Sequence, residues 1–264
     1  MYVVCLLSMF MAKPTRLHMV AAKRVLRYLK GTLGYGIRYK AGAQNDRLLS
    51  YTDSDYAGDI NDRRSTSGYV FFLAGGPVSW ASKKQPVMTL STTEAEFVAA
   101  AYSAAQCIWM KRILKEMGWL ETTGGGTRIL CDNSSTIKLS KNPVLHGRSK
   151  HIDVRFHFLR DLVKEEVIKL EHYGTTDQVA DIMTKAVKIE TFEKLRGELG
   201  MCTVAELQGE TDAAAGMSIS CLKLNLRRFE FRGGYVGSRI QGQSIWAGSR
   251  VLGVGSIKSP VSSQ

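Results

Sequence analysis

The feature that most constrains this chain is the order in which β-rich and helical segments follow one another. Three β-rich runs come in series, and a Gly-Gly pair separates the last two, a pattern typical of strands joined as hairpins or a meander. These runs occupy residues 47–54, 67–73 and 77–82. The Ala-rich segment 91–117 comes next, and Ser91 and Glu94 at its start form a capping-box pattern that predicts a long helix.

The segments after this helix alternate between strand and helix. The predicted elements are a strand at 127–131, helices from Asn133 and at 151–165, a strand at 167–173, and a helix from Thr176 to about Lys185. Upstream, apolar residues at helical spacing predict an amphipathic helix at 14–32. This order of strands and helices predicts an α/β domain.

Four acidic residues stand where an α/β fold collects function. Asp53 and Asp132 each end a predicted strand. Glu96 lies on the helix face that carries small apolar residues, and Asp181 is enclosed by apolar neighbours. Like charges brought together raise one another's pKa unless cations neutralise them, so the set predicts a metal site. Oxygen ligands favour Mg²⁺ or Mn²⁺, and a pair of such ions hydrolyses phosphodiesters, which predicts strand cleavage.

Two of these positions have a competitor. Asp55 lies on the same strand face as Asp53, because side chains alternate with period two, so strand geometry alone leaves both open. Glu94 competes with Glu96, but the two point to different helix faces, and Glu94 has a capping role available. The capping role of Glu94 favours Glu96, whereas the residues alone leave Asp53 and Asp55 open.

The charge balance favours a polyanionic partner. Lys and Arg number 36 against 24 Asp and Glu, for a formal net charge of +12, a bias that points to nucleic acid. Five cysteines are scattered without zinc-type spacing, which indicates reduced intracellular thiols. The apolar opening from Tyr2 to Met11 is too short to span a bilayer, so we expect no membrane segment and no secretion.

Six short motifs stand in order between Leu48 and Lys185. They are YTDSDYAG at 51–58, RSTSGY at 64–69, LSTTEAEF at 90–97, CDN at 131–133, KHIDVR at 150–155 and ADIMTK at 180–185. Together they resemble the ribonuclease H domain of Ty1/copia-type Pol polyproteins. Upstream, residues 21–32 resemble the segment that joins reverse transcriptase to ribonuclease H in the same polyproteins.

This resemblance implies a ribonuclease H-like fold, an α/β five-stranded mixed sheet flanked by helices. It also implies that four carboxylates hold two Mg²⁺ ions, which Mn²⁺ can replace, and by motif these carboxylates belong to Asp53, Glu96, Asp132 and Asp181. The implied activity is endonucleolytic hydrolysis of the RNA strand of an RNA–DNA hybrid. The alternative is a catalytically inactive retrotransposon relic that binds nucleic acid without cutting it.

Candidate substrate contacts lie in or beside the early strands. Basic side chains there are suited to backbone phosphates, and hydroxyls to the RNA 2′-OH. The candidates are Arg63, Arg64, Ser65, Thr66, Lys83 and Lys84, together with Asn133 beside the third acid.

The resemblance also divides the chain. Residues 1–46 are interpreted as a remnant of the reverse transcriptase and connection segment, and residues 47–200 as the ribonuclease H-like domain. In 201–264 the Gly, Ser and Ala content rises and periodicity fades, which predicts a disordered tail. No Tyr-x-Asp-Asp polymerase motif occurs, so we interpret the chain as a polyprotein fragment. The expected partners are an RNA–DNA hybrid and, in the parent element, reverse transcriptase. The expected location is the cytoplasm or the nucleus.

Overall fold

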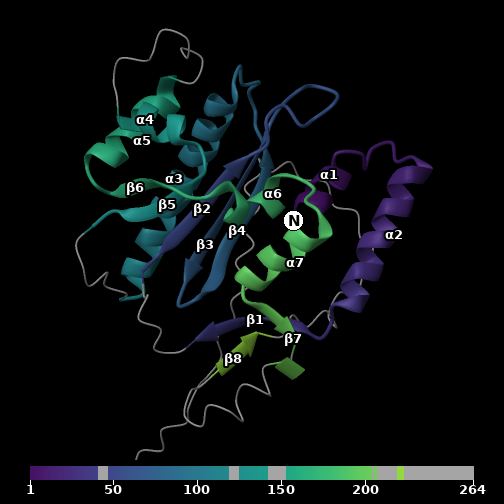
Figure 1. Cartoon of the computed structure of the whole chain (residues 1–264). Helices are drawn as coiled ribbons and strands as arrows, with labels where there is room; N and C mark the ends of the chain where they lie inside the picture. Colours follow the sequence, from purple (N-terminus) through teal and green to yellow (C-terminus); the bar gives the residue numbers. More distant parts are fainter. Residues whose placement is uncertain (41–46, 119–124, 142–152, 204, 207–218, 223–264) are drawn as a thin grey trace, which may run out of the picture. The chain divides into compact units, whose positions relative to one another are not determined.

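The structure is a computed structural model, and it describes residues 1–40, 47–118, 125–141, 153–203, 205–206 and 219–222. The chain divides into a unit spanning Met1–Leu224 and a second unit spanning Asn225–Gln264, and the second lies outside the described residues. Figure 1 labels the elements of the first unit.

A five-stranded mixed sheet forms the centre of the first unit (Figure 1), in the order β4-β3-β2-β5-β6. Its strands are β2 (Leu49–Ser54), β3 (Thr66–Leu73), β4 (Gly76–Lys84), β5 (Thr127–Cys131) and β6 (Ile168–His172). β2, β3 and β4 are antiparallel neighbours, whereas β2 pairs with β5, and β5 with β6, in parallel. Parallel neighbours need a crossover connection, which the helical segments after β4 and β5 supply. The predicted mixed sheet is therefore confirmed.

Helices cover both faces of this sheet. One face carries α3 (Thr92–Glu116), α4 (Ser134–Lys141) and α5 (Asp153–Lys164), and the other carries α6 (Asp181–Thr184) and α7 (Ile189–Glu198). The alternation of side chains along β3 explains how one strand serves both layers. Phe71 joins the core cluster beneath α3, whereas the preceding Val70 packs with Met183 and Leu199 on the opposite face. Each such buried side chain stabilises the fold by roughly 1.5–3 kcal/mol.

The segment before the sheet forms α1 (Tyr2–Ser8), α2 (Arg16–Gly31) and β1 (Tyr35–Lys40). β1 pairs antiparallel with β7 (Met201–Thr203) and with β8 (Ile219–Leu222) in a second sheet of order β7-β1-β8. The helix predicted at 14–32 is present as α2. All of its residues are described and none is buried, and its Tyr28 ring meets Phe192 of α7 with centroids 6.3 Å apart.

The predicted domain boundaries stay predictions. β1 lies before the boundary at residue 46, whereas β7 and β8 lie beyond the boundary at residue 200 and pair with it. Most of the predicted tail, including 223–264, lies outside the described residues, as do residues 142–152, which include the start of the KHIDVR motif. Within the described residues, no helix has both the length and the apolar character needed to cross a membrane.

The prediction of one continuous helix from Thr176 to about Lys185 is wrong. The segment instead forms a 3₁₀ turn (Thr175–Asp177), an extended residue at Gln178, and the four-residue α6. Gln178 is fully buried, and its Nε2 donates to the Thr52 carbonyl of β2 at 3.1 Å. This tertiary hydrogen bond interrupts the local helical pattern and ties the segment to the sheet.

Candidate active site

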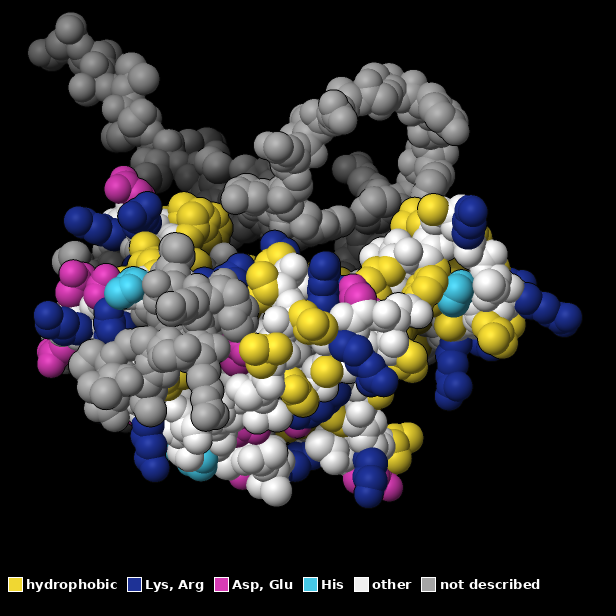
Figure 2. Space-filling view, turned by 90° about the horizontal axis from the view of Figure 1, so that it is seen from above, with side chains coloured by type: hydrophobic (Ala, Val, Ile, Leu, Met, Phe, Trp, Pro, Cys, Tyr) yellow, Lys and Arg dark blue, Asp and Glu magenta, His cyan; other side chains and the backbone are white. Residues whose placement is uncertain are grey.

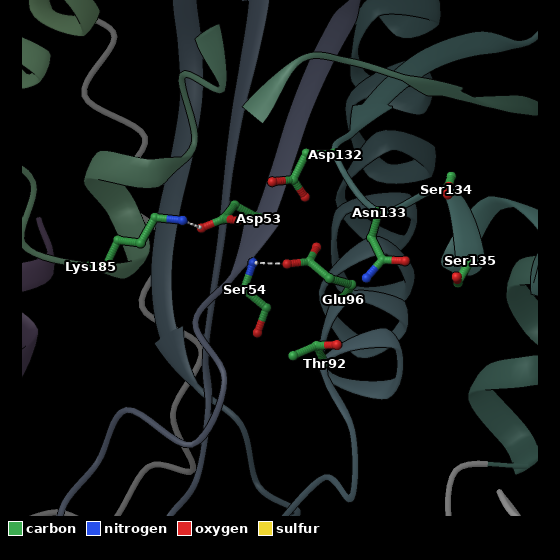
Figure 3. A pocket seen from close by; sticks show the side chains of 9 residues that line it. All are labelled: Asp53, Ser54, Thr92, Glu96, Asp132, Asn133, Ser134, Ser135 and Lys185. Carbon is green, nitrogen blue, oxygen red and sulfur yellow. Dashed lines mark hydrogen bonds and ion pairs between the residues drawn. The ribbon is translucent and has the colours of Figure 1, made fainter. Parts of the chain in front are cut away.

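Two acids meet at one edge of the central sheet. Asp53 is the penultimate residue of β2 and is 1% exposed, and Asp132 directly follows β5. β2 and β5 run in parallel, so their carboxyl ends lie at the same edge. Both residues line an open pocket of about 430 Å³, and Figure 3 shows both carboxylates directed into it.

Glu96 reaches the same pocket from the first turns of α3. Ser91 caps this helix by accepting a hydrogen bond from the Glu94 N–H at 3.2 Å. The Glu94 carboxylate in turn accepts from the N–H of Leu90, the residue before the capping Ser91, at 2.7 Å. The Glu96 Oε1 instead accepts from the Ser54 N–H at 3.0 Å (Figure 3), which joins the helix to the end of β2. The pocket lining includes Glu96, and Glu94 is not part of it.

The fourth acid, Asp181, begins α6. This short helix lies close to β3 because Gly68 has no side chain: a Cβ there would lie 2.7 Å from both Met183 Cβ and Thr184 Cγ2. The Thr184 hydroxyl donates to the Asp53 carboxylate and so links α6 to the end of β2. Lys185 completes the group, with Nζ 3.0 Å from Asp181 Oδ1 and 3.5 Å from Asp53 Oδ2.

Glu96, Asp132 and Asp181 hold their protons more tightly than isolated carboxyls. Burial, followed by the charges of Asp53 and Asp132, raises the pKa of Glu96 well above its usual value. Burial and the Asp53 charge also raise the pKa of Asp132, and they raise that of Asp181 to about 6. Burial opposes protonation of Lys185, but the Asp53 and Asp181 carboxylates outweigh it and raise the pKa of this ammonium group. One ammonium thus leaves most of the negative charge uncompensated.

The donor atoms fit hard divalent cations. The carboxylates supply oxygen ligands, which Mg²⁺ and Mn²⁺ prefer. Ligand atoms of Glu96, Cys131 and Asp132 all lie within 4.8 Å of one another. Burial raises the pKa of the Cys131 thiol in the ion-free protein. The pocket thus offers several carboxylate oxygens and one buried thiol to a divalent cation.

Asp55, the competitor of Asp53, is used differently. Its carboxylate accepts a hydrogen bond from the Thr66 N–H, which closes the turn between β2 and β3. Burial raises the pKa of Asp55 to about 6. Of the two acids, Asp53 is the one that lines the pocket.

The structure brings one of the seven candidate substrate residues to the pocket. Asn133 lines it, and its side-chain oxygen also accepts from the Thr136 N–H at 3.0 Å to cap α4. Arg63 and Arg64 are exposed in the turn before β3. Ser65 is fully buried, and its hydroxyl accepts from the Ala57 N–H at 3.0 Å, so it faces the interior.

The remaining candidates lie along β3 and β4. Thr66 is half-buried and Lys83 is exposed, with its Nζ 5.5 Å from the centre of the Tyr102 ring. Lys84 forms ion pairs with Asp59 and Asp62. Figure 2 shows basic side chains spread over the visible face among apolar and acidic ones, without one dominant basic block.

Three residues that shape the pocket received no role from the sequence: Lys185, Thr184 and Gly68. Lys185 and Thr184 stand in the ADIMTK motif, and the four-residue spacing between Asp181 and Lys185 was a usable signal, since such residues are neighbours on a helix. Gly68 stands in the RSTSGY motif, but its contact with α6 depends on a segment more than 100 residues away.

The mixed sheet with helices on both faces and the acid-lined edge defines a ribonuclease H-like domain. No family model matches the chain. The chain is 42% identical over 200 residues to the retrovirus-related Pol polyprotein from transposon TNT 1-94 of Nicotiana tabacum, a match covering 76% of this chain and 15% of the relative. It is 40% identical over 203 residues to the corresponding polyprotein from transposon RE1 of Arabidopsis thaliana, covering 77% of this chain and 14% of the relative.

Over about three quarters of its length the chain is homologous to the retrovirus-related Pol polyproteins of copia-type transposons. It spans about one seventh of the length of these curated relatives. Among solved structures it is similar to an RNase H1 isolated from compost, with a TM-score of 0.40 and 16% identity, covering 56% of this chain and 97% of that one. At this distance the fold assignment rests on the sheet topology described above.

Proposed function

We propose that this chain is an endoribonuclease that hydrolyses the RNA strand of RNA–DNA hybrids as part of a copia-type retrotransposon polyprotein. The observation that carries the proposal is the convergence of Asp53, Glu96 and Asp132 on one open pocket, with Asp181 behind them. Burial, followed by the charges of neighbouring acids, raises the pKa of Glu96, Asp132 and Asp181, which supports a cluster that takes up cations. A polyanionic substrate can approach such a pocket only when cations neutralise it.

The proposed cofactor is a pair of Mg²⁺ ions, with Mn²⁺ as a substitute, held by Asp53, Glu96, Asp132 and Asp181. When bound, such ions supply Lewis-acid activation of water and stabilise the charge on the leaving oxygen. The chain's own contribution is to fix the ligands. The Ser54 N–H holds Glu96, and the Thr184 hydroxyl holds Asp53, so both carboxylates are oriented before any ion arrives.

The proposed substrate contacts are the exposed Arg63, Arg64 and Lys83, with Lys84 and Thr66 nearby and Asn133 in the pocket. Basic groups in this region suit the hybrid backbone, and recognition of a 2′-OH would select the RNA strand. The proposed location is the cytoplasm or the nucleus. Reverse transcriptase of the parent element is the proposed protein partner.

The test is cleavage of an end-labelled RNA–DNA hybrid by purified protein with Mg²⁺, with single-stranded RNA as a substrate control. The Asp132→Asn variant keeps the shape of the side chain and removes its charge, so it is expected to abolish cleavage. Asp177→Asn is the matched control, because Asp177 pairs with Lys194 at the surface and is absent from the pocket lining. Hybrid binding without cleavage by the wild-type protein would favour the inactive relic.

A further inference from the structure

Lys185 places a cation of the chain's own inside the acid cluster. It follows α6 directly, four residues after Asp181, so the two side chains lie on the same side of this short helix. Its Nζ lies 3.0 Å from Asp181 Oδ1 and 3.5 Å from Asp53 Oδ2. Figure 3 shows the ammonium group directed at Asp53 from the side opposite Glu96.

The two carboxylates that Lys185 contacts are also two of the four proposed metal ligands. An ammonium group at hydrogen-bonding distance from a carboxylate occupies an oxygen that a divalent ion would use. Both cations are attracted by the same negative charge, so each weakens the binding of the other. The Lys185 side chain is 37% exposed, which leaves it room to move toward solvent when it is displaced.

We propose that Lys185 is a positioning residue that holds Asp53 and Asp181 together in the metal-free protein and competes with a divalent ion for these two carboxylates. This inference rests on the metal binding required by the proposed function. In the metal-free state the ammonium group reduces repulsion between the two acids. A divalent ion displaces it, so Lys185 sets the metal concentration at which the site fills.

If Lys185 competes with the metal, replacing it strengthens metal binding. Replacing a purely structural lysine would weaken metal binding. Lys185→Met is expected to bind Mn²⁺ about tenfold more tightly than the wild type, equivalent to about 1.4 kcal/mol. Loss of a merely structural contact would disorder the ligands and weaken binding. Lys185→Arg retains the charge and is expected to restore the wild-type affinity.

Mn²⁺ titration followed by electron paramagnetic resonance measures this affinity directly, without substrate. Lys194→Met is the matched control, because Lys194 forms its ion pair with Asp177 at the surface, and its affinity should equal that of the wild type. Equal or weaker Mn²⁺ binding by a folded Lys185→Met variant would overturn the competition and leave the proposed function standing. Absence of Mn²⁺ binding by the wild type would overturn both.

A second measurement uses the wild-type protein and so does not depend on the folding of a variant. An amine-reactive reagent modifies free lysines, and mass spectrometry of the peptides gives the rate at each position. Saturating Mg²⁺ is expected to speed modification of Lys185, because displacement exposes its ammonium group, while Lys194 keeps its rate. Slower or unchanged modification of Lys185 in Mg²⁺ would contradict displacement.

Discussion

In each of two clusters in this protein one lysine pairs with two aspartates, yet the electrostatics of the two clusters are opposite. At the surface, Lys84 lies 2.5 Å from Asp59 and 2.9 Å from Asp62. Its hydrogen bonds lower the pKa of both carboxyls. In the pocket, Lys185 lies at similar distances from Asp181 and Asp53, yet the pKa of Asp181 is raised to about 6.

The difference comes from the surroundings of each cluster. At Asp59 and Asp62 the hydrogen bonds from Lys84 outweigh the effect of lost solvent on the carboxylates, and Asp62 stays partly exposed. The carboxylates of the pocket lose solvent and face further acids, Glu96 and Asp132, so one ammonium group is insufficient. Burial and the additional acids thus turn an ordinary ion pair into a site that requires more cations.

Removing one aspartate from each cluster should produce the largest contrast. Asp53→Asn is expected to lower hybrid cleavage by about 10²- to 10³-fold, the size of effect found when one preorganised electrostatic group of an active site is removed. Asp62→Asn should leave the rate unchanged. Single-turnover cleavage in Mg²⁺ measures both. Similar losses in the two variants would mean that the buried cluster has no special role.

The pH dependence of stability should have opposite signs in the two clusters. In the folded, metal-free protein the pKa of Asp181 is about 6, above the value of about 3.9 for an unfolded aspartate. Protonated Asp181 therefore adds about 1–3 kcal/mol to the free energy of unfolding. This stabilisation is fully present below about pH 4 and is lost as the pH rises through 6.

Urea unfolding in EDTA at pH 4, 6 and 8 checks this sign. As the pH rises, the unfolding free energy of the wild type should fall relative to that of Asp181→Asn, because asparagine does not titrate. For Asp59 the folded pKa is lowered, so its contribution is present at neutral pH and is lost on acidification. This loss begins only as the pH falls below the unfolded pKa of about 3.9, so the gap in unfolding free energy between Asp59→Asn and the wild type should change little from pH 4 to pH 8. A rise in favour of Asp59→Asn over that range, parallel to that of Asp181→Asn, would contradict the comparison.

The buried cluster also depends on the close approach of α6 to β3. In Gly68→Ala the new methyl group meets Met183 and Thr184, so α6 must move, at an expected cost of about 1–3 kcal/mol of unfolding free energy. Cleavage should fall as well, because Asp181 moves with the helix. Gly197→Ala is the matched control, since a Cβ at Gly197 meets nothing within 4 Å. Thermal unfolding and cleavage rates of the two variants would show this difference, and equal stabilities would argue against the tight contact.

The smallest effect is expected from the surface lysine. Lys84→Met should change the unfolding free energy by less than about 1 kcal/mol, the usual range for exposed ion pairs. If Lys84 also contacts a backbone phosphate, the variant should bind the hybrid more weakly, with a salt-dependence slope reduced by about one. A salt titration of hybrid affinity measures this slope, and an unchanged slope would remove Lys84 from the substrate contacts.

Much of the central domain was predictable because its signals are local. The β-rich runs predicted β2 to β6 to within a few residues, and Ser91 with Glu94 marked the start of α3, which begins at Thr92. The placement of Glu96 on the buried face of α3 also followed from helical periodicity. Local propensity and periodicity decide these features, and both can be read from neighbouring residues.

Other features were decided only by tertiary structure. The β7-β1-β8 sheet joins segments more than 150 residues apart, and the break at Gln178 depends on a hydrogen bond to β2. Strand geometry alone left Asp53 and Asp55 open and only the motif favoured Asp53, whereas the fold directs Asp53 into the pocket and uses Asp55 in a turn. The sequence by itself thus determined the elements and the acids available to the site. The convergence of those acids around Lys185, and the burial that raises the pKa of Glu96, Asp132 and Asp181, required the packed sheet and helices, because distance and solvent exclusion are properties of the folded chain.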